Sequence, residues 1–290
     1  MLRSLLIGEI HGLAGPLPSP VVVLRAVLHC SWNVRADCLR NWVPASSKVF
    51  GVVYVLSPML IAFCLIGADR KLGADCFRRL TTLTGIRRAD WLLALGIMPI
   101  SILLAIAASL PFGYGMSQFR IATQPSFSAG ILSVWAVLIV VPVIEELAWH
   151  TYGTDCLRRR LSLFHTCLVF SVFWVLWHAP AVFVQGYYQN NLVRTGVWET
   201  VNFAVSIFPV VILMNWLYLR TGRSVWIAIL FHVTTGFSNE IFSPHPRTKL
   251  FQTGILLMFA AVLVVHEREL FFRRAPDPSP RPSAPRLRSS

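Results

Sequence analysis

Seven apolar stretches, each near the length of a membrane-spanning helix, dominate this chain. A helix needs about 20 apolar residues to cross a bilayer, and lipid offers an exposed backbone no hydrogen-bond partners. Of the 290 residues, 55% are hydrophobic and 13% are charged, against about 25% charged in soluble proteins. The sequence predicts an all-α, polytopic transmembrane bundle of about seven spans. These are Val49–Gly67, Trp91–Leu110, Ala129–Trp149, Leu163–Val184, Val201–Leu219, Val225–Phe237, which is short, and Leu250–His266.

The positions of the basic residues predict which ends of the helices face the cytoplasm. Segment 69–90 carries six lysines and arginines, whereas segment 111–128 carries one. Loops rich in Lys and Arg stay inside, so alternation puts Arg158–Arg160 and the C-terminal tail in the cytoplasm and loop 185–198 outside. The net charge of +13 is thus explained by loops, and we expect a bilayer rather than nucleic acid as the partner. The predicted location is the plasma membrane of a bacterium.

The two ends of the chain are predicted to differ from the helical domain, 49–266. Residues 1–48 carry five basic residues yet lie outside if there are seven spans, so a short or interfacial helix there, or an eighth span, is an alternative. No cleavable signal peptide is evident. Residues 267–290 are rich in Pro, Ser and Arg and are predicted to form a disordered cytoplasmic tail. The six cysteines form no CxxC pair and are expected to be reduced thiols.

Two adjacent carboxylates, Glu145 and Glu146, end the third apolar stretch. A charged side chain in mid-membrane costs roughly 2.5–3.5 kcal/mol and usually faces a cavity. Pro142 lies three residues before Glu145 and can open the helix there. The pattern favours a functional pair inside the bundle, and the alternative is a helix displaced outward with both carboxylates at the interface.

Two histidines in equally apolar surroundings are predicted to reach the depth of this pair. If the chain turns near residue 161, Glu145 and His178 each lie about 25 Å up their own antiparallel helices, at 1.5 Å per residue. His232 follows the basic residue Arg223 by nine positions, about 13 Å from the same side. One cavity, open toward the cytoplasm, is expected to hold all three side chains.

These residues lie in three segments, EELAWHTY, FWVLWHAP and SVWIAILFHVTT, that together resemble the motifs of the CPBP family. This is the family of CAAX-protease and bacteriocin-processing (Abi) membrane proteins, with the pattern EExxxR, FxxxH, then HxxxN or HxxxD. The resemblance covers residues 129–240 and implies the family's four-helix catalytic core. It also implies a glutamate-type intramembrane endopeptidase, without a cofactor, acting on a membrane-associated or lipidated protein. Relatives of this kind remove the last three residues of prenylated CAAX proteins.

The resemblance assigns a role to each matching position. Glu145 would be the base that activates water, His178 would help hold that water, and His232 would help stabilise the oxyanion. Such a mechanism is chemically sound, because a buried carboxylate beside imidazole is a competent base and a donor to the oxyanion is effective in a dry site.

Supporting residues follow where the chain departs from the family pattern. His150 replaces the arginine of EExxxR, but it lies four residues after Glu146, so an imidazolium can replace the guanidinium. Trp174 stands for the phenylalanine of FxxxH as an aromatic wall. Gly236 replaces the asparagine of HxxxN, and Thr235 can present a hydroxyl nearby.

Three alternatives to the active glutamate protease follow from the same residues. A metalloprotease would bind zinc through Glu145, His150, His178 and His232, which are suitable ligands. A noncatalytic scaffold or bacteriocin-immunity protein would explain the two lost family positions. A transporter or proton relay is a further alternative, although no inverted repeat is visible.

Overall fold

The computed structural model describes residues 44–273 except 82, 84 and 131, and within that range the chain is built of helices, with one isolated bridge between Ile121 and Phe242. The all-α prediction is confirmed. Most of the predicted N-terminal region and tail lie outside the described residues. The α-helices of the described range are α3 (Pro44–Gly67), α4 (Arg70–Thr81), α5 (Arg88–Ser109), α6 (Val134–Ala148), α7 (Thr154–Arg158), α8 (Leu163–His178), α9 (Tyr188–Thr195), α10 (Val197–Arg220), α11 (Val225–Glu240), α12 (Thr248–His266) and α13 (Arg268–Phe272).

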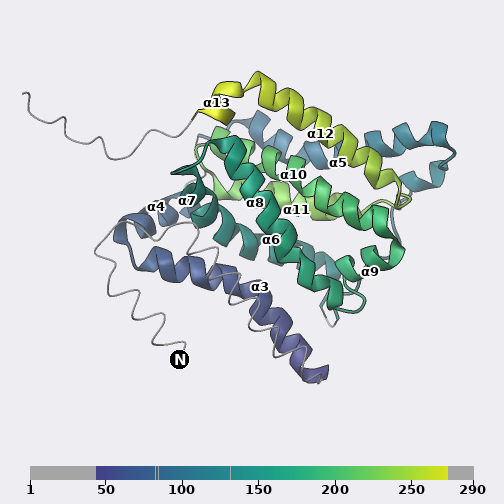
Figure 1. Cartoon of the computed structure of the whole chain (residues 1–290), viewed down its shortest axis with the longest axis horizontal. Coiled ribbons are helices and arrows are strands. Elements are labelled where there is room, and N and C mark those ends of the chain that lie inside the picture. The colour runs from purple at the N-terminus through teal and green to yellow at the C-terminus, as the bar shows by residue number, and fades with distance from the viewer. Residues whose placement is uncertain (1–43, 82, 84, 131, 274–290) are drawn as a thin grey trace, which may run out of the picture.

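Five helical segments are long and apolar enough to cross a membrane, which agrees with a polytopic bundle. They cover residues 88–112, 134–158, 163–183, 197–220 and 248–266. The other two predicted spans are also helical, as the apolar part of α3, Leu56–Gly67, and as α11. Helix α11 has 16 residues and packs against α5, α6 and α10 near the middle of the bundle (Figure 1). Because protein surrounds it, α11 does not need the full length of a lipid-exposed span.

The outer surface of the bundle is apolar, as a membrane protein requires. Helices α5 and α12 expose large side chains such as Leu92, Ile100, Met258 and Val265. Polar and charged side chains are instead found inside, among them Glu146 and His150, which are completely buried. A soluble protein has the reverse distribution, so this arrangement is that of an integral membrane protein.

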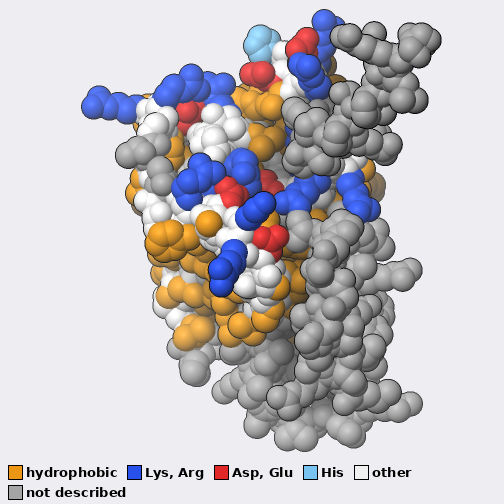
Figure 2. Space-filling view, turned by 90° about the vertical axis from the view of Figure 1, so that its left-hand side faces the viewer, with side chains coloured by type: hydrophobic (Ala, Val, Ile, Leu, Met, Phe, Trp, Pro, Cys, Tyr) orange, Lys and Arg blue, Asp and Glu red, His pale blue; other side chains and the backbone are white. Residues whose placement is uncertain are grey.

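The basic residues gather at one end of the bundle, where α4 and α7 lie. Figure 2 looks onto that side and shows arginine and lysine side chains with a few carboxylates beside an apolar surface. An Arg158 Nη1 group donates to the Arg273 carbonyl at 3.2 Å, so the turn after α7 and the start of the tail lie at the same end, as the charge pattern predicted. Helix α13, with Phe271 buried, extends the helical domain beyond His266. Cys64, Cys76, Cys156 and Cys167 are free thiols, and Cys30 and Cys38 lie outside the described residues.

Candidate active site

The two glutamates lie in the last turn of α6, at a change in helix type. Pro142 lies inside α6, and after Ala148 the chain continues as one π-helical turn, Trp149–Gly153, before α7. Proline lacks a backbone N–H donor, and single π-helical turns are frequent at functional sites. Glu145 is 5% exposed and Glu146 is fully buried, so the pair lies inside the bundle.

Glu146 uses both carboxylate oxygens on histidines from two helices. Its Oε1 accepts a hydrogen bond from His232 Nδ1 on α11 at 2.7 Å, and its Oε2 contacts His150 Nδ1 one turn further along its own helix. The His150 Nε2 lies 3.2 Å from Asn215 Oδ1 on α10. Both ring nitrogens of His150 thus face oxygen atoms, which a doubly protonated ring would satisfy by donating from both.

His150 therefore occupies the position expected for a cationic partner of Glu146. Its side chain is fully buried and packs edge-on against the Tyr218 ring, with centroids 4.6 Å apart. The imidazole lies between α6 and α10, in contact with Glu146 and Asn215, and does not face the lipid.

Glu145 is bonded quite differently from its neighbour. The two histidines that bind Glu146, His150 and His232, do not bond to the carboxylate of Glu145. Its charge nevertheless acts on His178, His232 and Tyr187. Burial, together with this charge, raises the pKa of Tyr187 to about 12. The Glu145 carboxylate thus lies buried within electrostatic range of the cavity histidines, without the histidine contacts that Glu146 makes.

His178 is held in one orientation at the end of α8. Its Nδ1 lies 2.8 Å from the Trp174 carbonyl, an acceptor, so Nδ1 carries the proton and Nε2 is left as the acceptor in the neutral ring. The Trp174 ring stands edge-on to His232, with centroids 5.0 Å apart, and 5.9 Å from His178. Trp174 thus contacts both histidines, as expected of an aromatic wall.

A cavity of about 430 Å³ lies beside these residues. His178, His232, Trp174 and Tyr187 line it, together with residues of α9, α10 and α12. Glu145 does not line it directly, but its charge acts on three residues that do. The volume suits a few residues of a peptide, since ligand pockets run from about 300 to 1,000 Å³.

The prediction that this cavity opens toward the cytoplasmic, arginine-rich end of the bundle is wrong. Its other walls come from segments 122–127, 187–195 and 239–246, which lie at the end of the bundle opposite the arginine-rich α4 and α7. Counting residues along a helix gives the depth of a side chain in the membrane. It does not show at which end of the bundle the helices separate to form a cavity. By the charge rule, this cavity end is the one assigned outside.

Four of the α11 residues that line the cavity form one stripe, His232, Thr235, Gly236 and Asn239. The Thr235 hydroxyl donates to the Phe231 carbonyl at 2.8 Å, so toward the cavity it can only accept. A Cβ atom at Gly236 would lie 2.9 Å from Leu138 Cδ2 on α6. Gly236 therefore lets α11 approach α6 closely.

The residues of the alternative zinc site do not form a ligand set. Both nitrogens of His150 and one of His178 are already hydrogen-bonded. Among residues 44–273, apart from the three gaps, no three His, Cys, Asp or Glu side chains are grouped so that they could hold a metal ion.

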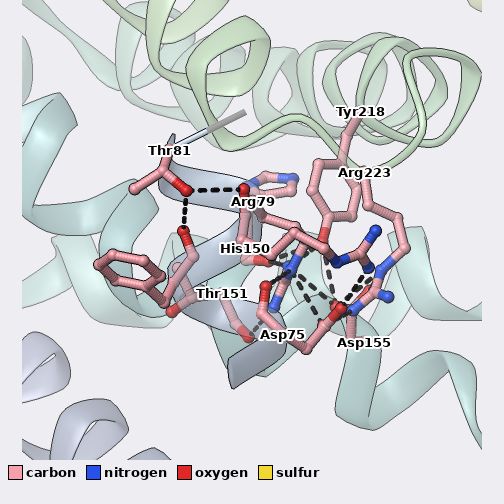
Figure 3. A network of polar contacts seen from close by, with 10 residues as sticks. Asp75, Arg79, Thr81, His150, Thr151, Asp155, Tyr218 and Arg223 are labelled. Atoms are coloured by element: carbon pink, nitrogen blue, oxygen red, sulfur yellow. Dashed lines mark hydrogen bonds and ion pairs between the residues drawn. The ribbon is translucent and has the colours of Figure 1, made fainter. Parts of the chain in front are cut away.

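A buried arginine holds the π-helical turn from the basic end (Figure 3). Arg79, on α4, donates from Nη1 to the His150 carbonyl at 2.8 Å and from Nη2 to the Thr151 carbonyl at 2.8 Å. Tyr218 Oη donates to the same His150 carbonyl at 2.7 Å. Carbonyls that lose their usual helical partners must be satisfied elsewhere when buried, and Arg79 and Tyr218 do this.

Two carboxylates and a second arginine complete this network. Arg79 Nη1 lies 3.1 Å from Asp155 Oδ2, and Arg79 Nε lies 3.1 Å from Asp75 Oδ2. Arg223 bonds to Asp155 and reaches Asp75 at 2.8 Å. The network joins α4, α7 and the turn before α11 around the segment that follows the glutamates.

Sequence reasoning missed Arg79, Asn215, Tyr218 and the two aspartates. Arg79 was counted as one loop charge among six, since nothing in RKLGADCFRRLT distinguishes a buried arginine from an exposed one. Asn215 was the more visible signal, because a lone amide within the apolar run VVILMNWLYL must find a polar partner.

Comparison with known proteins gives two matches. Residues 126–238 match the family model described as Type II CAAX prenyl endopeptidase Rce1-like, a range that contains both glutamates, His150, His178 and His232. The chain is also 33% identical over 222 residues to CAAX prenyl protease 2 of Methanococcus maripaludis, covering 76% of this chain and 82% of that protein.

Proposed function

The chain belongs to the CPBP family, with an Rce1-like CAAX prenyl endopeptidase domain, and we propose that it is an intramembrane endopeptidase that hydrolyses a peptide bond with a glutamate-activated water. Its substrate is a membrane-associated, lipidated protein, cleaved near its C-terminus to release a short peptide. The name of the relative, a prenyl protease, supports this substrate class. The protein works in the cell membrane, and the substrate enters from the cavity end.

The division of labour between the two glutamates supports the proposal best. Glu146 is fully used by His150 and His232, so it orients rather than reacts. Glu145 is buried, does not share the two histidine contacts of Glu146, and lies within electrostatic range of both cavity histidines. A carboxylate beside a substrate-sized cavity is what a general base needs.

The reaction follows from these positions. Glu145 takes a proton from a water molecule while the oxygen of that water adds to the peptide carbonyl carbon. The unprotonated Nε2 of His178 orients the same water. His232, ion-paired to Glu146 through Nδ1, donates from Nε2 to the developing oxyanion, an interaction worth several kcal/mol in a dry site. Glu145 then returns its proton to the leaving nitrogen as the C–N bond breaks.

Cleavage by purified protein in detergent tests this proposal. The substrate is a lipidated peptide with a fluorophore and a quencher on either side of the expected bond, assayed with and without a strong chelator. We expect cleavage that survives chelation and disappears in Glu145→Gln. Chelator-sensitive cleavage would instead support the metal-dependent protease, and no cleavage by the wild type would support the noncatalytic scaffold.

A further inference from the structure

One cavity-lining charge has no counterpart in the proposed mechanism, the ammonium group of Lys249. Lys249 is the second residue of α12 and lines the cavity beside Tyr188 and Asn239. Its Nζ lies 3.3 Å from Tyr188 Oη, 3.5 Å from the Asn239 carbonyl and 5.2 Å from the centre of the Tyr188 ring. These contacts fix the position of the ammonium group without neutralising it.

The other charged groups of the cavity rim already have partners. Glu199 is ion-paired with Arg247 at 2.9 Å. Glu240 accepts hydrogen bonds from the backbone N–H and hydroxyl of Ser126, at 2.6 and 2.8 Å. Within the described part of the chain no carboxylate forms an ion pair with Lys249, which leaves its ammonium group available to an anionic ligand.

The distance from Lys249 to the reacting groups fits a short peptide. Asn239 follows His232 by seven residues on the same face of α11, which places it about 10 Å further along the helix. Lys249 Nζ contacts the carbonyl of Asn239. Three extended residues also span about 10 Å, at roughly 3.3–3.6 Å each.

We propose that Lys249 binds the C-terminal carboxylate of the substrate and thereby places the third peptide bond from the C-terminus at Glu145 and His232. This inference rests on the proposed function and adds to it how the position of the cleaved bond is set by its distance from the C-terminus. The ion pair fixes one end of the peptide and the water-activating groups fix the scissile bond. A carboxylate is the natural ligand, because ammonium–carboxylate hydrogen bonds are stronger than neutral ones.

The experiment compares three lipidated peptides of one sequence. The first has a free C-terminal acid, the second has a C-terminal amide, and the third has one additional residue at its C-terminus. The enzymes are wild type, Lys249→Gln, Lys249→Arg and the control Arg194→Gln, which removes an exposed charge of α9 that does not line the cavity. We expect the wild type to prefer the acid over the amide by roughly 10- to 100-fold in kcat/KM, the worth of one charged hydrogen bond.

Lys249→Gln should lose this preference by cleaving the acid more slowly and the amide at the wild-type rate. Lys249→Arg should keep most of the preference, and Arg194→Gln should keep all of it. The extended peptide should be cut one bond further toward its C-terminus. Equal cleavage of acid and amide by the wild type, or an unchanged preference in Lys249→Gln, would overturn the proposal.

Two further measurements identify the carboxylate that Lys249 binds and separate binding from catalysis. An amidated peptide with an aspartate as its last residue tests whether Lys249 can bind a side-chain carboxylate in place of the C-terminal one. If this peptide is cleaved as fast as the free acid, Lys249 does not specifically recognise the C-terminal carboxylate. Binding of fluorescent acid and amide peptides to Glu145→Gln, and to Glu145→Gln with Lys249→Gln, needs no catalysis. Wild-type inactivity therefore defeats the proposed function alone, whereas equal binding of both peptides defeats the Lys249 anchor.

Discussion

Glu146 and His150, four residues apart across the junction of α6 and the π-helical turn, are in direct contact through Oε2 and Nδ1. The junction keeps the i, i+4 pairing that an α-helix provides, although the backbone there is π-helical. His150 thus contacts Glu146 from the position that an arginine occupies in the family pattern. The same carboxylate also binds His232, so one residue couples α6 to α11.

The two glutamates should respond differently to the same substitution. Glu145→Gln is nearly isosteric but cannot accept a proton, so we expect kcat to fall by roughly 100- to 10,000-fold with an unchanged melting temperature. Glu146→Gln should lower both, because a neutral amide cannot pair with two histidines. Peptide cleavage and thermal unfolding in detergent measure the two effects. Cleavage by Glu145→Gln at the wild-type rate would show that Glu145 is not the base.

Arg79 and Arg78 offer a matched pair on one helix. Arg79 is buried and satisfies two carbonyls of the π-helical turn, so Arg79→Gln should reduce the free energy of unfolding by roughly 3–5 kcal/mol, as for a broken buried pair. Arg78 is 69% exposed in its side chain and pairs only with Asp75, so Arg78→Gln should cost about 0–1 kcal/mol. Unfolding by denaturant in detergent measures both values. Equal losses would show that Arg79 does not support the turn.

Asp75 predicts how this end of the bundle responds to acid. Burial alone would raise its pKa, but the hydrogen bond from Arg78 and the charges of Arg79 and Arg223 outweigh it and hold the pKa below its ordinary value. A carboxylate with a lowered folded-state pKa contributes stability at higher pH, which is lost as pH falls through that pKa. Asp75→Asn should therefore be less stable than wild type at neutral pH, and the difference should shrink on acidification. A difference that grows in acid would contradict this.

The helical class and the depth of the site could be predicted from the sequence because both depend on local regularities. Apolar length identifies spans, and a rise of 1.5 Å per residue placed Glu145 and His178 at one height, with His232 on the same side of the membrane but nearer the basic end. The structure brings these residues within electrostatic range of one another. Their catalytic roles remain a prediction.

The partners around the site depend on side-to-side packing, which local patterns do not encode. Asn215 meets His150 from 65 residues away, and Arg79 reaches the His150 carbonyl across 71 residues. The end at which the cavity opens cannot be predicted from local patterns either, because it depends on how α9 and the loops around it pack. Lys249 lies at a helix start where sequence alone indicates only a solvated charge.

Membrane orientation is predicted by the charge rule and decides the side of substrate entry. Single cysteines at residues 160, 190 and 270 of a cysteine-free variant, probed with a membrane-impermeant reagent, should place 160 and 270 in the cytoplasm and 190 outside. The cavity end would then face outward. Labelling that puts 190 in the cytoplasm would reverse the charge-rule orientation and bring substrates from that side, whereas 160 and 190 on one side would contradict the bundle itself.

His150→Arg tests whether the cation beside Glu146 is what the site needs. A guanidinium stays charged at every working pH and can bind a carboxylate through two hydrogen bonds, so we expect activity equal to or above that of wild type. The wild type should be more sensitive to alkaline pH than His150→Arg, because an imidazolium can lose its charge and a guanidinium cannot. His150→Gln, which keeps a hydrogen-bond donor but no charge, should be impaired at every pH.

The pH profiles of the three forms of position 150 distinguish an ion pair from a metal ligand and from a purely structural residue. A metal-dependent site would be destroyed by His150→Arg, because arginine is not a zinc ligand. A purely structural role would change the melting temperature of both variants and leave the shape of the pH profile unaltered. An alkaline loss that is present in wild type and absent in His150→Arg requires the ion pair. Identical profiles with equal rates in wild type and His150→Arg would show that the charge of His150 plays no part in the reaction.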